Sequence, residues 1–422
     1  MKLFRKIQKW FENQENLYYL FLIILIVPNI VLCFTEPMPL VAKVCNVLLP
    51  FSIYHMIMSW SGNCGKTFWI LFPFLFFGAF QIVLLYLFGQ SVIAVDMFLN
   101  LVTTNPGEAL ELLDNLIPAI IIVVLLYIPA LVLAAVAVSK KRRLSETLVR
   151  RERKRARITV IAGILSLVAA YLFDARYELK SDLYPANVCY NIALAFQRTA
   201  QTQHYAETSK DFTFQAKTTR PEKNREVYVM VIGETSRAAN WSIYGYNRNT
   251  NPELTKIKGL TAFSHVLTES NTTHKSVPML MSSVTAHDFN SIYRQKGIIT
   301  AFKEAGYRTA FFSNQRYNHS FIDFFGKEAD ICDFIKEDTG DGSYNPSDDE
   351  LLKLVAAELA ENASKQFIVL HTYGSHFNYR ERYPADNAFF LPDFPVDAEL
   401  KYKDNLINAY DNSIRYTDNF LA

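Results

Sequence analysis

The stretch VYVMVIGETSR, from Val227 to Arg237, joins an apolar run to an abrupt polar end. The run Val227–Ile232 is typical of a buried β-strand. Gly233 interrupts it, and the carboxylate of Glu234 and two hydroxyl side chains follow. Because ligands of open α/β sheets bind beyond the carboxyl ends of the strands, this pattern predicts a buried strand whose polar tail lies at a ligand site.

After this stretch, the chain alternates between short apolar runs and segments of helical periodicity. The runs TAFFS (309–313) and QFIVLHTY (366–373) are rich in β-branched and aromatic residues. The segments SIYRQKGIITAFKEAG (291–306) and DDELLKLVAAELAENA (348–363) carry apolar residues at helical spacing. This alternation predicts an α/β domain over residues 227–422, with a mainly parallel sheet between helices.

The first part of the chain has a different composition. Five apolar stretches, near 17–34, 40–60, 68–88, 116–138 and 158–173, approach the length of about 20 residues that a helix needs to cross a membrane. Helices buried in a soluble core are the alternative, but the number and length of the stretches favour membrane spans. We therefore expect a five-helix transmembrane domain over residues 1–173.

Positive charge predicts the orientation of these spans. The N-terminus MKLFRKIQKW is basic, and the segment Ser139–Arg157 carries ten Lys and Arg against two Glu. Basic loops stay in the cytoplasm, so five spans from a cytoplasmic N-terminus leave the later domain in a bacterial periplasm. A nucleic-acid patch is the alternative for the basic segment. Its place between two spans and the net charge of +2 favour the membrane, and we expect no nucleic-acid partner.

Residues 174–226 connect the two predicted domains. Pro185 is suited to start a helix, and apolar residues recur after it at helical spacing, which predicts an amphipathic helix on the membrane surface. The polar stretch FTFQAKTTRPEKNRE then has the composition of a linker.

Three polar clusters in the α/β domain are candidates for one site. Glu234 could simply complement a helix dipole. The hydroxyls of ESNTTHKSVPMLMSS (269–283) could be N-caps, although a helix N-terminus also stabilises a phosphate. Either His371 or His376, at the end of the third apolar run, could be a core residue. Three such clusters in one α/β domain favour a site.

These clusters also carry a family resemblance. The segments GETSRAANWSIYGYNRNTNP, SNTTHKSVP, LHTYGSH and YDNSIRYTD resemble the membrane-bound phosphoethanolamine transferases that modify lipid A and lipopolysaccharide. The outer domain of that family resembles alkaline phosphatases and sulfatases. The resemblance implies transfer of phosphoethanolamine from phosphatidylethanolamine to lipid A or lipopolysaccharide core, through a covalent threonine intermediate and with zinc.

The resemblance also implies roles for individual residues. Glu234 matches a zinc ligand, and Thr273 matches the nucleophile, which also contacts the metal. His376 matches a histidine near the substrate phosphate. In the predicted outer loop, Asn100 and Glu108 match positions that hold the ethanolamine end of the donor, although Glu108 could also be an ordinary helix-start carboxylate.

One element of the family pattern is missing. The remaining zinc ligands of the family include an Asp-His pair, and this sequence contains no Asp-His dipeptide. The interpretation from the sequence is a fragment of a longer enzyme, with a form that lacks catalysis as the alternative. A phosphoglycerol transferase, a sulfatase-like hydrolase and a non-catalytic lipid-binding protein are the alternative functions. The sequence does not identify the acceptor, the number of zinc ions or the oligomeric state.

Overall fold

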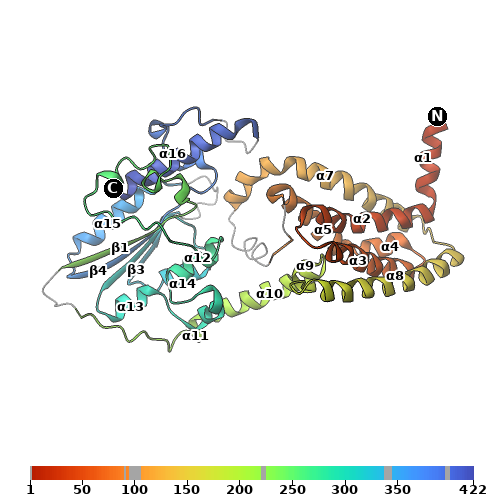
Figure 1. The fold of residues 1–422 in the computed structure, drawn as a ribbon, viewed down its shortest axis with the longest axis horizontal. Coiled ribbons are helices and arrows are strands. Elements are labelled where there is room, and N and C mark those ends of the chain that lie inside the picture. Colours follow the sequence, from red (N-terminus) through yellow and green to blue (C-terminus); the bar gives the residue numbers. More distant parts are fainter. Residues whose placement is uncertain (1, 90–91, 95–105, 220–224, 337–344, 395–399) are drawn as a thin grey trace. The chain divides into compact units, whose positions relative to one another are not determined.

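The computed structural model describes residues 2–89, 92–94, 106–219, 225–336, 345–394 and 400–422. The chain forms two compact units. The first comprises residues 1–101 and 113–197, and the second comprises residues 102–112 and 198–422 (Figure 1). The three predicted domain ranges stay a prediction.

The first unit is helical. Four of its described helices are long and apolar enough to cross a membrane, namely α2 (Gln14–Thr35), α3 (Leu40–Trp60), the part of α7 (Pro106–Ser139) from Leu116, and α8 (Glu146–Phe173). Shorter helices accompany them, namely α1 (Lys2–Glu12), α4 (Cys64–Ile70), α5 (Phe72–Phe88) and α9 (Leu179–Asp182). Helix α10 (Ala186–Gln203) begins directly after Pro185, and its predicted place on a membrane surface stays a prediction.

The predicted continuous span 68–88 is broken. Helices α4 and α5 meet at Leu71 with a bend of 61°, so they form one broken span or a re-entrant pair. Pro73 in the first turn of α5 explains the break, because proline has no N–H to continue the hydrogen-bond ladder of α4. The described chain thus contains four helices that could span a membrane. If the bent pair of α4 and α5 forms one further span, the number is five.

Small residues bring the helices of the first unit together. A Cβ atom at Gly163 of α8 would lie 2.7 Å from Ser52 Oγ and 3.2 Å from Leu49 Cα in α3. Such close backbone approach is the usual packing of helices in membranes, where van der Waals contact drives association. Large apolar side chains such as Ile121, Leu125 and Leu165 remain exposed on α7 and α8, as expected for lipid-facing surfaces.

The second unit contains a four-stranded parallel sheet. Its strands are β1 (Glu226–Ile232), β2 (Arg308–Ser313), β3 (Ile331–Phe334) and β4 (Lys365–His371), in the spatial order β1-β4-β2-β3. Its helices are α11 (Tyr205–Thr208), α12 (Thr273–Leu280), α13 (Ile298–Glu304), α14 (Phe321–Gly326), α15 (Glu350–Ala360) and α16 (Lys403–Leu421). The predicted α/β class with a parallel sheet between helices is confirmed.

Helices lie on both faces of this sheet (Figure 1). Alternate residues of the central strands pack on opposite faces. Phe311 and Val369 belong to a core with α12, α13 and α14, whereas Phe312 and Ile368 belong to a core with α15 and α16. This separation follows from the two-residue period of a strand. The covered faces explain why β4 is buried along its whole length.

The prediction that Val227–Ile232 is buried is wrong for its first half. Val227, Tyr228 and Val229 are 38%, 36% and 46% exposed, although Ile232 is buried. The physical reason is the position of β1 at the edge of the sheet, where it pairs with β4 alone among the described strands. The end of β1 that carries Glu234 is nevertheless the end that packs into the domain.

Candidate active site

Glu234 lies just beyond the end of β1. Its carboxylate accepts two hydroxyl hydrogen bonds, from Thr235 Oγ1 to Oε1 at 2.7 Å and from Thr273 Oγ1 to Oε2 at 2.9 Å. Thr235 has a φ of 53°, which places a β-branched residue in the left-handed region. Such outliers are costly and cluster at functional sites. The backbone therefore turns sharply right after the carboxylate.

Thr273 is the first residue of α12. Thr272 holds the N-cap position, but its side chain makes no capping hydrogen bond. Its hydroxyl instead lies 3.1 Å from Ser270 Oγ. The hydroxyl of Thr273 turns to Glu234, 39 residues earlier in the chain. The alternative that Thr273 is merely an N-cap is therefore wrong, and its hydroxyl lies at a helix N-terminus, where negative charge is stabilised.

The loop after β4 supports the backbone of Glu234. The parallel register pairs Ile232 with His371, so the polar tails of both strands emerge together. Ser375 N–H donates to Glu234 O at 3.0 Å. Gly374 has a φ of 55°, and a Cβ atom there would lie 2.6 Å from Glu234 O. Only glycine fits this close approach without displacing Glu234.

Asp348 binds the backbone of the same loop after β4. Its carboxylate accepts the N–H of Tyr373 at 2.8 Å, that of Gly374 at 2.9 Å and the side-chain amide of Asn314 at 2.8 Å. Burial raises the pKa of the Asp348 carboxyl above its ordinary value, and these three donors oppose that rise. Asp348 thus holds the turn that positions Glu234.

The two histidines of the third cluster differ in environment. His371 is buried at the end of β4, with Nδ1 3.3 Å from Ser313 Oγ, and burial lowers its pKa to about 4. It is a neutral core residue at physiological pH. His376 is half-buried, stacks on Tyr373 at 5.1 Å, and donates from Nδ1 to the carbonyl of Phe377 at 2.6 Å. Its Nε2 is therefore the ring nitrogen left to meet a ligand.

The structure brings some predicted residues together and leaves others apart. Glu234 and Thr273 are in direct contact. His376 is one residue from the Ser375 that binds Glu234 O, but the described structure shows no hydrogen bond from His376 to either Glu234 or Thr273. Asn100 lies outside the described residues, and Glu108 lies in α7 with a side chain that is likewise outside them.

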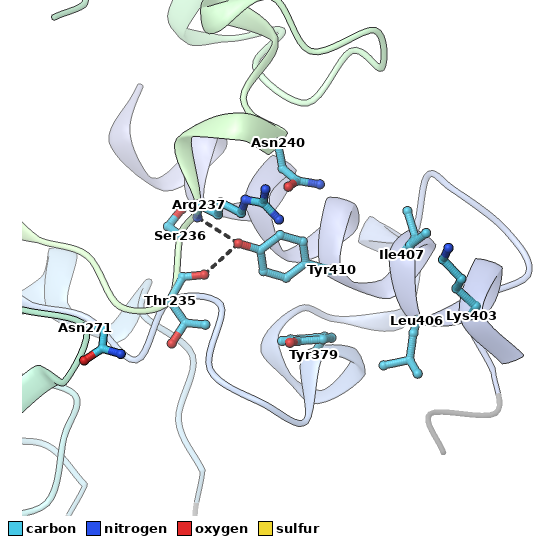
Figure 2. Close-up of a pocket in the computed structure, with 10 residues that line it drawn as sticks. All are labelled: Thr235, Ser236, Arg237, Asn240, Asn271, Tyr379, Lys403, Leu406, Ile407 and Tyr410. Carbon is cyan, nitrogen blue, oxygen red and sulfur yellow. Dashed lines mark hydrogen bonds between the residues drawn. The ribbon is translucent and has the colours of Figure 1, made fainter. Parts of the chain in front are cut away.

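A cavity of about 920 Å³ opens beside this site (Figure 2). Its walls are formed by the loop after β1, by Asn271 and by α16. The cavity is lined by Thr235, Ser236, Arg237, Asn240, Asn271, Tyr379, Lys403, Leu406, Ile407 and Tyr410. Its lining combines the exposed cations Arg237 and Lys403 with the apolar side chains of Leu406 and Ile407.

Helix α16 holds the loop that follows Glu234. The fully buried Asp411 accepts hydrogen bonds from Asn240 at 2.9 Å and Tyr246 at 2.8 Å, and it pairs with Arg248 at 2.6 Å. Two turns further along the same face of the helix, Asp418 accepts the backbone N–H groups of residues 253 and 254. The segments GETSRAANWSIYGYNRNTNP and YDNSIRYTD thus form one hydrogen-bonded assembly.

The described residues contain no complete set of metal ligands. No group of three His, Cys, Asp or Glu side chains converges within the described ranges. The Glu234 carboxylate and the Thr273 hydroxyl are nevertheless two adjacent oxygen donors, a donor type that zinc accepts. The residues present therefore fit one side of a zinc ion.

Sequence reasoning missed several supporting residues. Asp348, Gly374, Tyr410 and Asp411 have no individual signal, because each acts on a segment distant in the chain. Asp411 and Asp418 lie seven residues apart on the same face of α16. Asp404 continues this spacing but is exposed, so the spacing alone does not predict a buried network.

Two family models match parts of this chain. Residues 226–422 match the family model described as Sulfatase, and residues 53–200 match the model described as Phosphoethanolamine transferase EptA/EptB. The second match falls on the helical part of the chain and the first on the part that contains the sheet.

Curated relatives cover part of the chain. The Kdo(2)-lipid A phosphoethanolamine 7''-transferase of Escherichia coli K12 is 32% identical over 51% of this chain and 38% of its own length. The Phosphatidylethanolamine transferase Mcr-1 of Escherichia coli is 30% identical over 60% of this chain and 49% of its own length. The chain spans less than half the length of either relative in these matches.

One solved structure covers nearly the whole chain. The integral membrane lipooligosaccharide phosphoethanolamine transferase A (EptA) from Neisseria meningitidis matches with a TM-score of 0.71 and 19% identity, over 96% of this chain and 77% of that chain. At this identity, the match shows a shared fold.

Proposed function

We propose that this chain is a membrane-bound phosphoethanolamine transferase, which transfers phosphoethanolamine from phosphatidylethanolamine to lipid A or lipopolysaccharide core. The matches of its helical part and of its sulfatase-like part to the two family models support this proposal. The observation that carries this proposal is the hydrogen bond from Thr273 Oγ1 to Glu234 Oε2, at 2.9 Å and at the N-terminus of α12. A hydroxyl oriented by a carboxylate, with backbone N–H groups beside it, is suited to attack a phosphate ester.

The reaction has two half-reactions. First, Thr273 Oγ attacks the phosphorus of phosphatidylethanolamine. An Oγ–P bond forms, the P–O bond to diacylglycerol breaks, and the hydroxyl proton ends on the diacylglycerol oxygen. Then a hydroxyl oxygen of the acceptor attacks the same phosphorus, the Oγ–P bond breaks, and the proton of that hydroxyl ends on Thr273 Oγ. The intermediate lets one lipid leave before the next arrives.

The surrounding residues have separate tasks in this proposal. Glu234 orients the hydroxyl of Thr273. His376, held by Phe377 through Nδ1, lies near the bound phosphate. Asn100 and Glu108 hold the ethanolamine end of the donor. Zinc, when bound by Glu234 and Thr273, would lower the pKa of the threonine hydroxyl and stabilise charge on the phosphoryl group.

The membrane supplies both lipids in this scheme. We place the N-terminus and the basic segment 139–157 in the cytoplasm, and the sulfatase-like part in the periplasm of a bacterial inner membrane. Helices able to span a membrane support this location. The charge distribution of the sequence supports the orientation.

A transfer assay with two neighbouring threonines tests the proposal. The full-length membrane protein would be given phosphatidylethanolamine and lipid A in mixed micelles, and modified lipid A would be measured by mass. Thr273→Ala should lose at least about 1000-fold in rate, because it removes the attacking atom. Thr272→Ala, which removes a hydroxyl that contacts Ser270, should stay within a few-fold of wild type. Full activity of Thr273→Ala contradicts the proposal.

A further inference from the structure

We propose that Tyr410 of α16 is a positioning residue, whose hydroxyl fixes the turn that aims Glu234 at Thr273. This inference rests on the proposed function for its kinetic consequence. Its structural part concerns only the loop after β1 and α16, and it can be tested separately.

The hydroxyl of Tyr410 contacts the backbone on both sides of Ser236. It accepts the N–H of Arg237 at 2.7 Å and donates to the carbonyl oxygen of Thr235 at 2.7 Å (Figure 2). One side-chain oxygen therefore satisfies a donor and an acceptor of the same short turn. The turn begins at the residue that directly follows Glu234.

This turn needs an external constraint. The left-handed φ of Thr235 is unfavourable for a β-branched residue. The cost of one such residue and the net gain from two hydrogen bonds are of the same order. Without the Tyr410 hydroxyl, Thr235 would have free energy to gain by relaxing to an ordinary φ. Such relaxation would rotate the peptide next to Glu234.

Tyr410 is well suited to hold the turn. Its ring packs edge-on against Tyr379, with centroids 4.9 Å apart. The adjacent Asp411 anchors α16 to Asn240, Tyr246 and Arg248 of the same loop. Burial raises the pKa of Tyr410 to about 12, so its hydroxyl remains protonated and can donate to Thr235 O near neutral pH. The constraint is therefore rigid and chemically stable.

A matched pair of variants tests this role. Tyr410→Phe removes the hydroxyl that bridges the turn. Tyr416→Phe removes an equivalent hydroxyl from the same helix, but that hydroxyl donates to Asp349. Tyr410→Phe loses two hydrogen bonds of α16 and Tyr416→Phe loses one, so a general loss of stability should affect both. Only Tyr410→Phe should affect the turn after Glu234.

Amide hydrogen exchange in the full-length membrane protein reads out the turn directly. In Tyr410→Phe, the N–H of Arg237 should exchange about 5- to 10-fold faster, which is the factor expected for one lost hydrogen bond. In Tyr416→Phe its exchange should equal that of wild type. Equal exchange in all three proteins would overturn the proposal.

The rate at which Thr273 is modified measures whether Glu234 is still oriented correctly. With saturating phosphatidylethanolamine vesicles and no acceptor, Tyr410→Phe should modify Thr273 about 10- to 100-fold more slowly, because the orientation of Glu234 is lost. Tyr416→Phe should match wild type. Equal rates for Tyr410→Phe and wild type, or equal losses in both variants, overturn the positioning role. If wild type itself is never modified, the proposed function fails, and the exchange result still decides the structural role.

A second variant removes the donor of the hydrogen bond from Arg237 N–H to the Tyr410 hydroxyl. Arg237 has a φ of −75°, which proline adopts without strain. Arg237→Pro removes the N–H that donates to Tyr410, and Arg237→Ala removes only the side chain. The proline variant should be slower than the alanine variant by about the factor seen for Tyr410→Phe. Equal rates for the two Arg237 variants contradict the proposal.

Discussion

At the scale of single residues, the position of Glu234 depends on backbone contacts as much as on its own side chain. Gly374 approaches Glu234 so closely that a Cβ atom would lie 2.6 Å from its carbonyl oxygen. Ser375 donates its N–H to the carbonyl oxygen of Glu234, and Asp348 accepts the N–H of Gly374. A change at Gly374 therefore acts on the candidate site through the backbone.

Gly374→Ala should displace Glu234 and abolish most transfer. Gly306→Ala is its matched control, because Gly306 also has a positive φ of 84° but has no atom within 4 Å of a built Cβ. Both variants should lose about 1–2 kcal/mol from the strained conformation, and only Gly374→Ala should lose more through the clash. Thermal unfolding and the transfer assay would measure the two effects. Equal losses in stability and activity would contradict the importance of the close approach.

The sequence predicted the chemistry-bearing residues better than their supports. Glu234 and Thr273 were predicted from a family resemblance, and the structure brings their side chains into contact. Their catalytic and metal-binding roles stay predictions, as does the role of His376. Asp348 and Tyr410 could not be predicted individually, because their partners are backbone atoms of distant segments, and no periodicity records such contacts.

At the scale of elements, the longer strands were predictable from the sequence, whereas the short β3 and the exposure of β1 were not. Strands β1, β2 and β4 follow the apolar runs of the sequence closely. The four-residue β3 was missed, since so short a run has no distinct pattern. The exposure of β1 was also missed, because strand order is a tertiary property. Conversely, Pro73 in the sequence FPFLFF gave a visible signal for the break between α4 and α5.

The attachment of α16 to the loop after β1 gives a prediction at this scale. Asp411→Asn should destabilise the protein by about 3 kcal/mol, because it leaves the partly buried Arg248 without its carboxylate partner. Asp404→Asn, at an exposed position near the start of the same helix, should have little effect. Thermal unfolding in detergent would show the difference. A shift in Tm for Asp411→Asn no larger than for Asp404→Asn would contradict the role of this network.

At the scale of the whole molecule, we expect the basic segment 139–157 and the sulfatase-like part to face different compartments. Lys140 and Lys217 are both exposed on the protein itself, so only a membrane would shield one of them from protease. Trypsin added to intact spheroplasts should cut near Lys217 and spare Lys140 until the cells are lysed. Mass spectrometry of the fragments measures this, and cleavage at Lys140 before lysis would reverse the proposed orientation.

The central claim is that Thr273 carries the transferred group. The most direct measurement is the mass of the peptide containing Thr273, after the full-length membrane protein has been incubated with phosphatidylethanolamine vesicles and without acceptor. We predict that this peptide gains one phosphoethanolamine group on Thr273, and that the gain disappears when lipid A is added. A glycerol phosphate adduct, an adduct on another residue, or an unmodified Thr273 in protein that still modifies lipid A would contradict the account.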